Sequence, residues 1–305
     1  MERSDVTLER LRSFVRVAER GSLSAVAREL GLGQSSITRH IRELETAVGI
    51  PLLSRTTRRV AMTEEGRRYY ASALQILRLV DQAGEEARGQ RGAVAGTIRL
   101  SCTAAFGVLQ ATRLVFAFQD RHPGIDVDLS LTDERIDLVR EGVDLALRLG
   151  PLADSGLKLR PVGQCRRILV AAPAYLAAHG RPSRPAELAA HQGIRMANVA
   201  GSEVLSLRGP DGTVQSVPFG GRLRVDHGLA AREAFRAGRG LGPTHRWLVA
   251  DLLADGQLEE ILPDYRLPPV PMSLLIQPER AGIARVRLLA DFLAGEIRRI
   301  PGIEA

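Results

Sequence analysis

The chain contains little of the chemistry that marks a secreted, metal-binding or membrane protein. Its 305 residues include two cysteines, Cys102 and Cys165, too few for the disulfide framework of a small secreted domain. No apolar run approaches the roughly 20 residues that a membrane-spanning helix needs, and the start, MERSDVTLERLR, lacks the apolar core of a signal peptide. We therefore expect a protein of the prokaryotic cytoplasm without membrane contact. Free cysteines usually pack as small hydrophobes, so we expect two buried thiols, with a redox switch as the alternative.

Catalytic and metal-binding signatures are also missing from the sequence. It has no HExxH, no GxSxG, no Walker loop and no His/Cys cluster with metal-ligand spacing. The pair Gly240 and Gly242 is far too weak a signal for a nucleotide site. These absences argue against an enzyme and against a bound metal or cofactor.

Basic charge is present, and nearly all of it is arginine. The formal net charge is +7, the sequence pI is about 10.3, and Lys158 is the single lysine among the 42 basic residues. Excess positive charge favours polyanionic partners such as nucleic acid, although it does not identify one by itself.

Residues 22–59 predict a helix, a tight turn, a second helix and a basic hairpin. Ser22 or Ser24 can cap the first helix, and Gly31 lies where a helix end favours a residue that tolerates positive φ. Leu32 and Gly33 form the turn. A preceding helix over residues 7–20, with apolar residues at helical spacing, supports this pair as scaffold.

The predicted helix over residues 34–48 has two distinct faces. One face is an apolar stripe that consists of Ile37, Ile41, Leu44 and Val48. The other face carries hydroxyls and guanidinium groups without a carboxylate: Ser35, Thr38, Arg39 and Arg42. Such a face fits a DNA major groove, where arginine reads guanine edges and hydroxyls reach bases or phosphates. The alternative interpretation is the ordinary solvated face of a helix.

A basic hairpin follows this helix. Gly49 and Pro51 end the helix, and residues 52–55 and 60–62 predict two short strands. The tip between the strands, Thr56-Thr57-Arg58-Arg59, suits insertion along a minor groove or phosphate backbone; the alternative is a solvated loop. The combination of a trihelical core, turn glycines and a basic wing favours DNA binding.

Residues 11–66 follow a dense, ordered pattern: Leu11, Phe14, Gly21-Ser22-Leu23, Val26-Ala27, Leu30, Gln34-Ser35-Ser36, Ile41, Leu44-Glu45, Gly49, Leu52-Leu53, Arg55 and Thr63-Glu64-Glu65-Gly66. This pattern resembles the winged helix-turn-helix of LysR-type transcriptional regulators. The resemblance implies that the major groove is met by Gln34, Ser35, Ser36, Thr38, Arg39 and Arg42. It also implies that Arg58 or Arg59 reaches the adjacent minor groove, and Arg55 completes the predicted set of DNA contacts.

A long helix is predicted after the wing, from Thr63 as its cap to about Arg91. Its apolar seam consists of Tyr69, Ala73, Ile76, Val80, Ala83 and Ala87, with Tyr70, Leu74 and Leu77 beside it. The seam either packs on its own domain or, as the resemblance implies, pairs with the same helix of a second copy. A homodimer of this kind would place two recognition helices on successive half-sites.

The remainder of the chain alternates between strands and helices. The glycine-rich stretch 89–96 predicts a hinge, and strands near 98–102, 125–131 and 143–147 alternate with helices over 106–121 and around 136–139. This βαβαβ run indicates a parallel sheet covered by helices. Further signals are a hairpin around residues 209–212, helices over 230–237, 247–254 and 283–299, and a late strand at 273–276 that returns to the first lobe.

This α/β part resembles the effector domain of the same family, which is similar to periplasmic binding proteins. We therefore expect three parts: a winged helix-turn-helix over residues 1–63, a linker or dimerisation helix over 64–91, and a two-lobed effector domain over 92–305. Ligands of open α/β sheets bind beyond the carboxyl ends of strands, and family members bind effectors between the lobes. The resulting candidates are Thr103, Asp133, Arg148 and His227.

Each candidate also has a purely structural interpretation. Thr103 and Asp133 can be helix caps, Arg148 can pair with a carboxylate, and His227 can be a partly exposed histidine without a ligand. One departure from the family pattern concerns the cleft, because the segment after Gly240-Leu241-Gly242 looks about two residues short before Leu248.

The sequence thus predicts a regulator that binds specific DNA sites and is controlled by a small molecule. Its expected partners are double-stranded promoter DNA, further copies of itself in a dimer or tetramer, RNA polymerase and a small-molecule effector. The main alternative outside regulation is an architectural protein that binds DNA without sequence preference.

Overall fold

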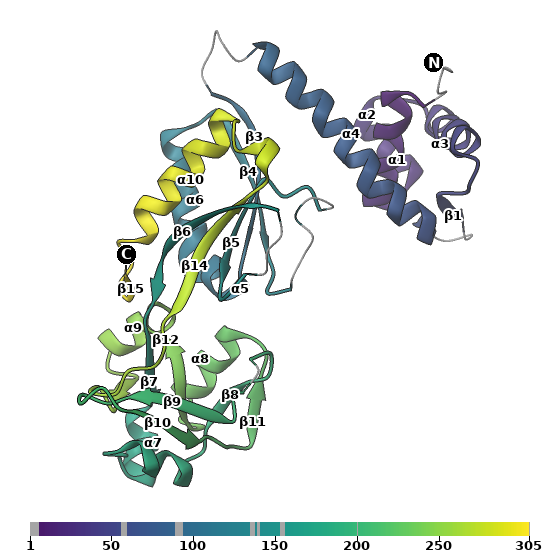
Figure 1. Cartoon of the computed structure of the whole chain (residues 1–305). Coiled ribbons are helices and arrows are strands. Elements are labelled where there is room, and N and C mark those ends of the chain that lie inside the picture. The colour runs from purple at the N-terminus through teal and green to yellow at the C-terminus, as the bar shows by residue number, and fades with distance from the viewer. Residues whose placement is uncertain are drawn as a thin grey trace. The chain divides into compact units, whose positions relative to one another are not determined.

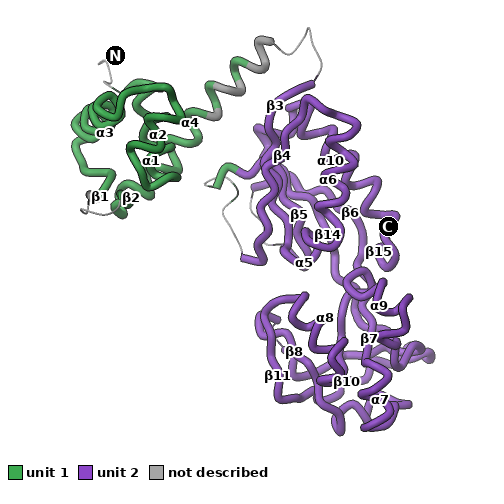
Figure 2. Tube along the Cα trace, turned by 180° about the vertical axis from the view of Figure 1, so that it is seen from behind, with its two compact units in different colours: residues 1–93, 136–142 green, residues 94–135, 143–305 purple. Residues whose placement is uncertain are grey.

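The computed structural model describes residues 6–55, 60–88, 94–134, 138, 141–152, 156–199 and 201–304. Two compact units are distinguished: residues 1–93 with 136–142, and residues 94–135 with 143–305 (Figures 1 and 2). We call them the head and the two-lobed unit. Among the helices within the described ranges, none is long and apolar enough to cross a bilayer.

The head is built from four helices and a short hairpin. Its elements are α1 (Leu8–Arg20), α2 (Leu23–Leu30), α3 (Gln34–Val48), β1 (Leu53–Arg55), β2 (Val60–Met62) and α4 (Glu64–Arg88). Ser22 caps α2, because its hydroxyl accepts a hydrogen bond from the Ala25 N–H at 3.3 Å. Gly31 and Gly49 end α2 and α3 with φ values of 65° and 79°, which L side chains rarely adopt. The predicted bounds of α3 are confirmed.

The apolar stripes of these helices meet in one core. Ile37, Ile41 and Leu44 of α3 are fully buried, as is Phe14 of α1, which makes an edge contact with Tyr69 of α4 at 5.8 Å between ring centroids. The first half of α4 therefore belongs to the head, with Ala73, Leu74 and Leu77 in its core. Further along α4, three apolar side chains stay exposed in the single chain: Ile76, Leu79 and Val80.

The first lobe of the two-lobed unit is a six-stranded sheet with the order β15-β6-β14-β5-β3-β4. Its strands are β3 (Gly96–Cys102), β4 (Ile125–Leu131), β5 (Leu145–Leu149), β6 (Lys158–Cys165), β14 (Val270–Ile276) and β15 (Ile303–Glu304). Strand β3 is parallel to β4 and β5, which confirms the predicted parallel core of the lobe. Strand β14 lies antiparallel between β5 and β6, so the predicted return of a late strand is also confirmed.

Helices pack against this sheet. A continuous helical stretch consists of α5 (Ala104–Phe106), a π-helical turn η1 (Gly107–Ala111) and α6 (Thr112–Arg121), and it begins two residues before the predicted start. Helix α10 (Ala284–Ile297) lies beside α6 (Figure 1). The predicted helix around residues 136–139 falls outside the described residues except for Leu138, which lies in a turn.

The second lobe contains three smaller sheets, with the orders β12-β7-β13, β11-β8 and β10-β9. Its strands are β7 (Arg167–Ala171), β8 (Ile194–Met196), β9 (Val204–Arg208), β10 (Val214–Pro218), β11 (Leu223–Val225), β12 (Leu241–His245) and β13 (Glu259–Ile261). Its helices are α7 (Pro173–His179), α8 (Gly228–Arg236) and α9 (Ala250–Ala254), with short 3-10 turns η2 (Pro185–Ala190) and η3 (Arg246–Leu248); η4 (Pro278–Arg280) follows β14. The predicted hairpin around residues 209–212 is confirmed as β9–β10.

One local prediction in this lobe needs correction. The predicted single helix over 247–254 is divided into η3 and α9, because the backbone of Val249 (φ −127°, ψ 14°) leaves the helical region. The segment after Gly242 that looks short forms the end of β12 and η3, and β12 pairs with β7 without a register shift.

Candidate DNA-binding and effector sites

The predicted DNA-binding face of α3 is accessible in the head. Gln34, Ser35, Arg39 and Arg42 are exposed, and Ser36 and Thr38 are half-buried. Gly33 precedes the helix without a side-chain cap, and its carbonyl accepts from the N–H groups of Ser36 and Ile37. The N–H groups of Gln34 and Ser35 therefore remain available to an outside acceptor, as far as the described residues are concerned. The apolar stripe of α3 packs in the core of the head, and the polar face of the helix is therefore exposed to solvent.

The arginines of the head fall into two groups. On α1, Arg10 pairs with Glu43 at 2.8 Å, Arg16 pairs with Glu19 at 2.6 Å, and Arg20 pairs with Glu29 at 3.0 Å. On α3, Arg39 and Arg42 form no ion pair or side-chain hydrogen bond with any residue that the structure describes. The positive charge of α3 is therefore free for an external anion.

Sequence reasoning missed Arg28, on the last turn of α2. This side chain is exposed and likewise has no carboxylate partner within the described part of the chain. Its position directly before the turn that leads into α3 is the signal that could have identified it.

The hairpin is defined by three residue pairs, from Leu53 opposite Met62 to Arg55 opposite Val60. The backbone of Arg55 ends β1, whereas its side chain is not described. The predicted tip residues Arg58 and Arg59 lie outside the described residues.

Three of the four predicted effector residues, Thr103, Asp133 and His227, lie outside helices and strands at the junction of the two lobes, and Arg148 lies near the end of β5. Thr103 precedes α5, yet its hydroxyl makes no cap hydrogen bond. Asp133 caps the start of α5 instead, because its Oδ1 accepts a hydrogen bond from the Ala104 N–H at 2.9 Å. The structural interpretation therefore holds for Asp133 and fails for Thr103, whose buried hydroxyl lies beside the Cys102 thiol.

His227 of the second lobe lies close to Asp133 of the first lobe. It caps α8, because its Nδ1 accepts from the Leu229 N–H at 3.2 Å, and its Nε2 lies 3.8 Å from Oδ2 of Asp133. A Cβ added at Gly228 would lie 3.2 Å from the Cβ of Ala105, so the start of α8 lies against α5. Oδ1 of Asp133 thus contacts the first lobe, and its Oδ2 lies near the second lobe.

Arg148 is half-buried and has no carboxylate within hydrogen-bond distance among the described residues. Its Nη2 donates to Ser101 Oγ at 2.7 Å and its Nη1 donates to the Leu147 carbonyl at 3.1 Å. Burial lowers the pKa of this guanidinium, and the nearby carboxylate of Asp133 opposes that shift. A partly desolvated arginine held by neutral acceptors is suited to an incoming anion.

Two further polar atoms at the junction, Oγ1 of Thr244 and Nδ1 of His245, are buried and form no hydrogen bond with the residues that the structure describes. The Trp247 ring stacks on His245 (5.5 Å, 14°) and meets Phe106 of the first lobe edge-on (5.0 Å, 78°). Sequence reasoning did not identify these residues as site candidates; the polar pair Thr244-His245 inside an otherwise apolar strand was the available signal.

Both cysteines are buried and free, as expected. Burial raises the pKa of each thiol to about 12. Since thiolates are the reactive form, neither cysteine is suited to peroxide sensing in the folded protein.

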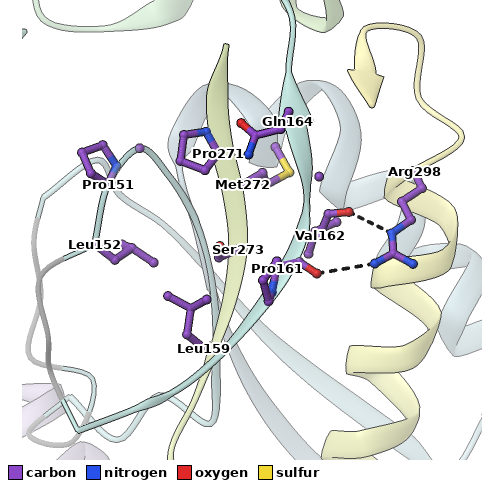
Figure 3. A pocket seen from close by; sticks show the side chains of 12 residues that line it. Pro151, Leu152, Leu159, Pro161, Val162, Gln164, Pro271, Met272, Ser273 and Arg298 are labelled. Atoms are coloured by element: carbon purple, nitrogen blue, oxygen red, sulfur yellow. Dashed lines mark hydrogen bonds between the residues drawn. The ribbon is translucent and has the colours of Figure 1, made fainter. Parts of the chain in front are cut away.

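A hollow of about 360 Å³ lies elsewhere on the first lobe, beside β6 and β14 (Figure 3). Its lining is mainly apolar and includes Leu159, Pro161 and Met272. Arg298 closes one side, donating from Nε to the Val162 carbonyl at 2.8 Å. It contains none of the four predicted effector residues.

Family models match most of the chain. Residues 8–67 match the "Bacterial regulatory helix-turn-helix protein, lysR family", and residues 91–298 match the "LysR substrate binding domain". The chain belongs to the LysR family. It is a transcriptional regulator with a helix-turn-helix DNA-binding domain and an effector-binding domain, as the resemblance implied.

Relatives resemble this LysR-family protein over nearly their full length. The chain is 31% identical over 295 residues to the probable HTH-type transcriptional regulator LtrA of Klebsiella pneumoniae, covering 96% of this chain and 94% of that protein. It is 32% identical over 287 residues to the HTH-type transcriptional regulator DmlR of Escherichia coli, covering 94% and 93%. Among solved structures, CrgA, a LysR-type transcriptional regulator from Neisseria meningitidis, has a TM-score of 0.62 at 29% identity, covering 96% and 99%.

Proposed function

We propose that α3 is the recognition helix and enters the major groove with Gln34, Ser35, Ser36, Thr38, Arg39 and Arg42. The observation that carries this assignment is the contrast in charge pairing. Three arginines of α1 (Arg10, Arg16 and Arg20) pair with glutamates, whereas Arg39 and Arg42 face solvent unpaired within the described residues. Arg55 and either Arg58 or Arg59 then supply contacts from the wing to the adjacent minor groove or backbone.

Replacement of Arg39 by alanine tests this assignment. A bidentate arginine–guanine contact contributes about 1–3 kcal/mol of discrimination, so affinity for the preferred site should fall roughly five- to 150-fold while affinity for random DNA changes much less. The measurement is a binding titration on a duplex enriched from a random-sequence pool by the full-length protein, with random competitor DNA. Arg236→Ala in α8, exposed and paired with Glu233 at 2.7 Å, is the charge-matched control.

Unchanged affinity and selectivity in Arg39→Ala would show that α3 does not read the bases. Failure of the pool to converge on any sequence, with uniform salt-sensitive binding, would instead favour an architectural protein.

We further propose that the working protein is a dimer, or a tetramer built from dimers, joined through α4. Ile76, Leu79 and Val80 are 43%, 59% and 38% exposed, respectively, on a helix whose first half is already buried in the head. A second copy of α4 is the partner that covers this stripe and sets two recognition helices at half-site spacing.

The effector is proposed to bind at the lobe junction, where Thr103, Asp133, Arg148 and His227 gather. A ligand that favours one arrangement of the two lobes over another would shift their populations, and with them the geometry of the paired heads on DNA. We propose that this change in the geometry of the bound heads affects the access of RNA polymerase to the promoter. We also propose that the protein works in the cytoplasm.

Arg148→Met tests the effector site. Small carboxylates that raise the melting temperature of the wild-type protein should lose about tenfold or more in affinity, because the charge-assisted hydrogen bond is removed. The matched control is Arg160→Met, a partly exposed arginine of the same sheet that pairs with Asp291 at 2.6 Å. Equal loss in both variants would contradict a specific role for Arg148.

A further inference from the structure

The end of the recognition helix holds the start of the wing through one carboxylate. Oε1 of Glu45, near the end of α3, accepts hydrogen bonds from the backbone N–H groups of Leu52 and Leu53, at 2.8 and 3.0 Å. Both leucine side chains are buried in the core of the head. A carboxylate that accepts two backbone donors makes stronger hydrogen bonds than a neutral acceptor, and its loss would leave two partly buried N–H groups unpaired.

Helix α4 holds the same segment from its other side. The Thr63 N–H donates to the Leu52 carbonyl at 3.0 Å, and the Thr63 hydroxyl donates to the Pro51 carbonyl at 2.9 Å. The same hydroxyl accepts from the Gly66 N–H at 2.9 Å and so caps α4. One threonine therefore connects residues 51–52 to the first turn of α4.

Gly66 permits this close approach. A Cβ at position 66 would lie 1.9 Å from the oxygen and 2.9 Å from the carbon of the Leu52 carbonyl, distances that only a backbone shift could relieve. Glycine inside a helix costs about 1 kcal/mol relative to alanine. Its presence in the first turn of α4 is thus explained by contact with residues 51–53.

The wing needs such an anchor. Its two strands have three residues each and pair only with one another within the described residues, and an isolated two-stranded hairpin is marginally stable in water. Within the described residues, β1 is therefore held where it begins, at Leu52 and Leu53, while Val60 and Met62 of β2 pack against the core of the head.

We propose that Glu45, Thr63 and Gly66 form a clamp around residues 51–53 that positions the wing on DNA. Glu45 is a positioning residue in this clamp: its Oε1 accepts from the Leu52 and Leu53 N–H groups, so it acts through the wing. Because α4 grips the same residues, a reorientation of α4 moves the wing and α3 together. This inference rests on the proposed contact between the wing and DNA.

The test is a double-mutant cycle between Glu45→Ala and Arg58→Ala, measured as affinity of the full-length protein for its pool-selected duplex. Arg58→Ala alone should weaken binding about tenfold and lower the salt slope by about one. In the Glu45→Ala background the same change should cost less than about twofold, because a displaced wing no longer brings Arg58 to DNA. If Glu45→Ala only destabilised the head, Arg58→Ala would weaken DNA binding about tenfold in both the wild-type and the Glu45→Ala protein.

Glu43→Ala is the charge-matched control on the same helix. Glu43 pairs with Arg10 and is not part of the clamp. Removal of either carboxylate lowers repulsion from DNA, so electrostatics alone predicts tighter binding for both variants. We expect Glu43→Ala to bind at least as tightly as wild type and Glu45→Ala about tenfold more weakly; equal behaviour of the two would overturn the proposal.

Two more variants make the result independent of folding defects. Glu45→Gln keeps an acceptor oxygen toward Leu52 and Leu53 and should restore most of the coupling to Arg58. Gly66→Ala reaches the clamp from α4 and should reproduce the loss of coupling, so it carries the cycle if Glu45→Ala does not fold; wild-type coupling in this variant would overturn the role of α4. An absent effect of Arg58→Ala in the wild-type background would instead reject the proposed wing contact.

Discussion

Replacing Phe106 by alanine should lower the free energy of unfolding of the two-lobed unit by about 3–5 kcal/mol, the range for a fully buried phenylalanine. Phe106 is 0% exposed and meets Trp247 edge-on at 5.0 Å, so its ring is shared between α5 of the first lobe and η3 of the second. Removal leaves a cavity between the lobes and deletes an aromatic pair. The variant should therefore lose both stability and the fixed relation of the lobes.

Trp247 makes this effect directly measurable, because it is the single tryptophan of the chain. Denaturant unfolding followed by its fluorescence reports on the junction itself. Phe116→Ala is the control: the same substitution in α6, at a side chain that is 60% exposed, should change stability by no more than about 0.5 kcal/mol. Similar losses for the two variants would show that the junction is not the packed centre that the contacts indicate.

Acid should weaken the same junction through His245. Burial, aided by the charge of Arg167 opposite it in β7, lowers the pKa of His245 from 6.5 to about 4. Between these two values the unfolded chain binds a proton that the folded protein does not. The contribution of His245 is thus fully present above about pH 6.5 and is lost as the pH falls toward about 4, by on the order of 3 kcal/mol in total.

Comparison with His245→Gln isolates this contribution from that of other titrating groups. Unfolding free energies of both proteins would be measured from about pH 7 down to about pH 4.5. The wild-type protein should lose more stability over this range, by a difference that grows as the pH falls. Parallel curves for the two proteins would mean that His245 does not remain neutral in the folded state.

The head could be predicted from sequence in detail because its signals are local. Ser22 caps the helix that begins next to it, Gly31 and Gly49 end the helices before them, and Ile37 and Ile41 are one turn apart. Each of these features is decided within a few residues of chain. The bounds of α3 and its two faces followed from them.

The lobe junction shows where such reasoning ends. Asp133 was predicted near Thr103 because both follow parallel strands, but its hydrogen bond to Ala104, 29 residues earlier, requires the assembled sheet. Phe106 and Trp247 are still further apart along the chain, and nothing local indicates that their rings meet.

The sequence by itself determined the family, the order of the domains, and the bounds and two faces of α3, because periodicity, caps and turn residues act over one or two turns of chain. Only the tertiary structure decided how the polar groups at the junction lie, how Glu45 and Gly66 meet at the wing, and that β14 lies between β5 and β6. The reason is physical: these contacts join segments distant in sequence, and their geometry depends on the packing of all elements between them.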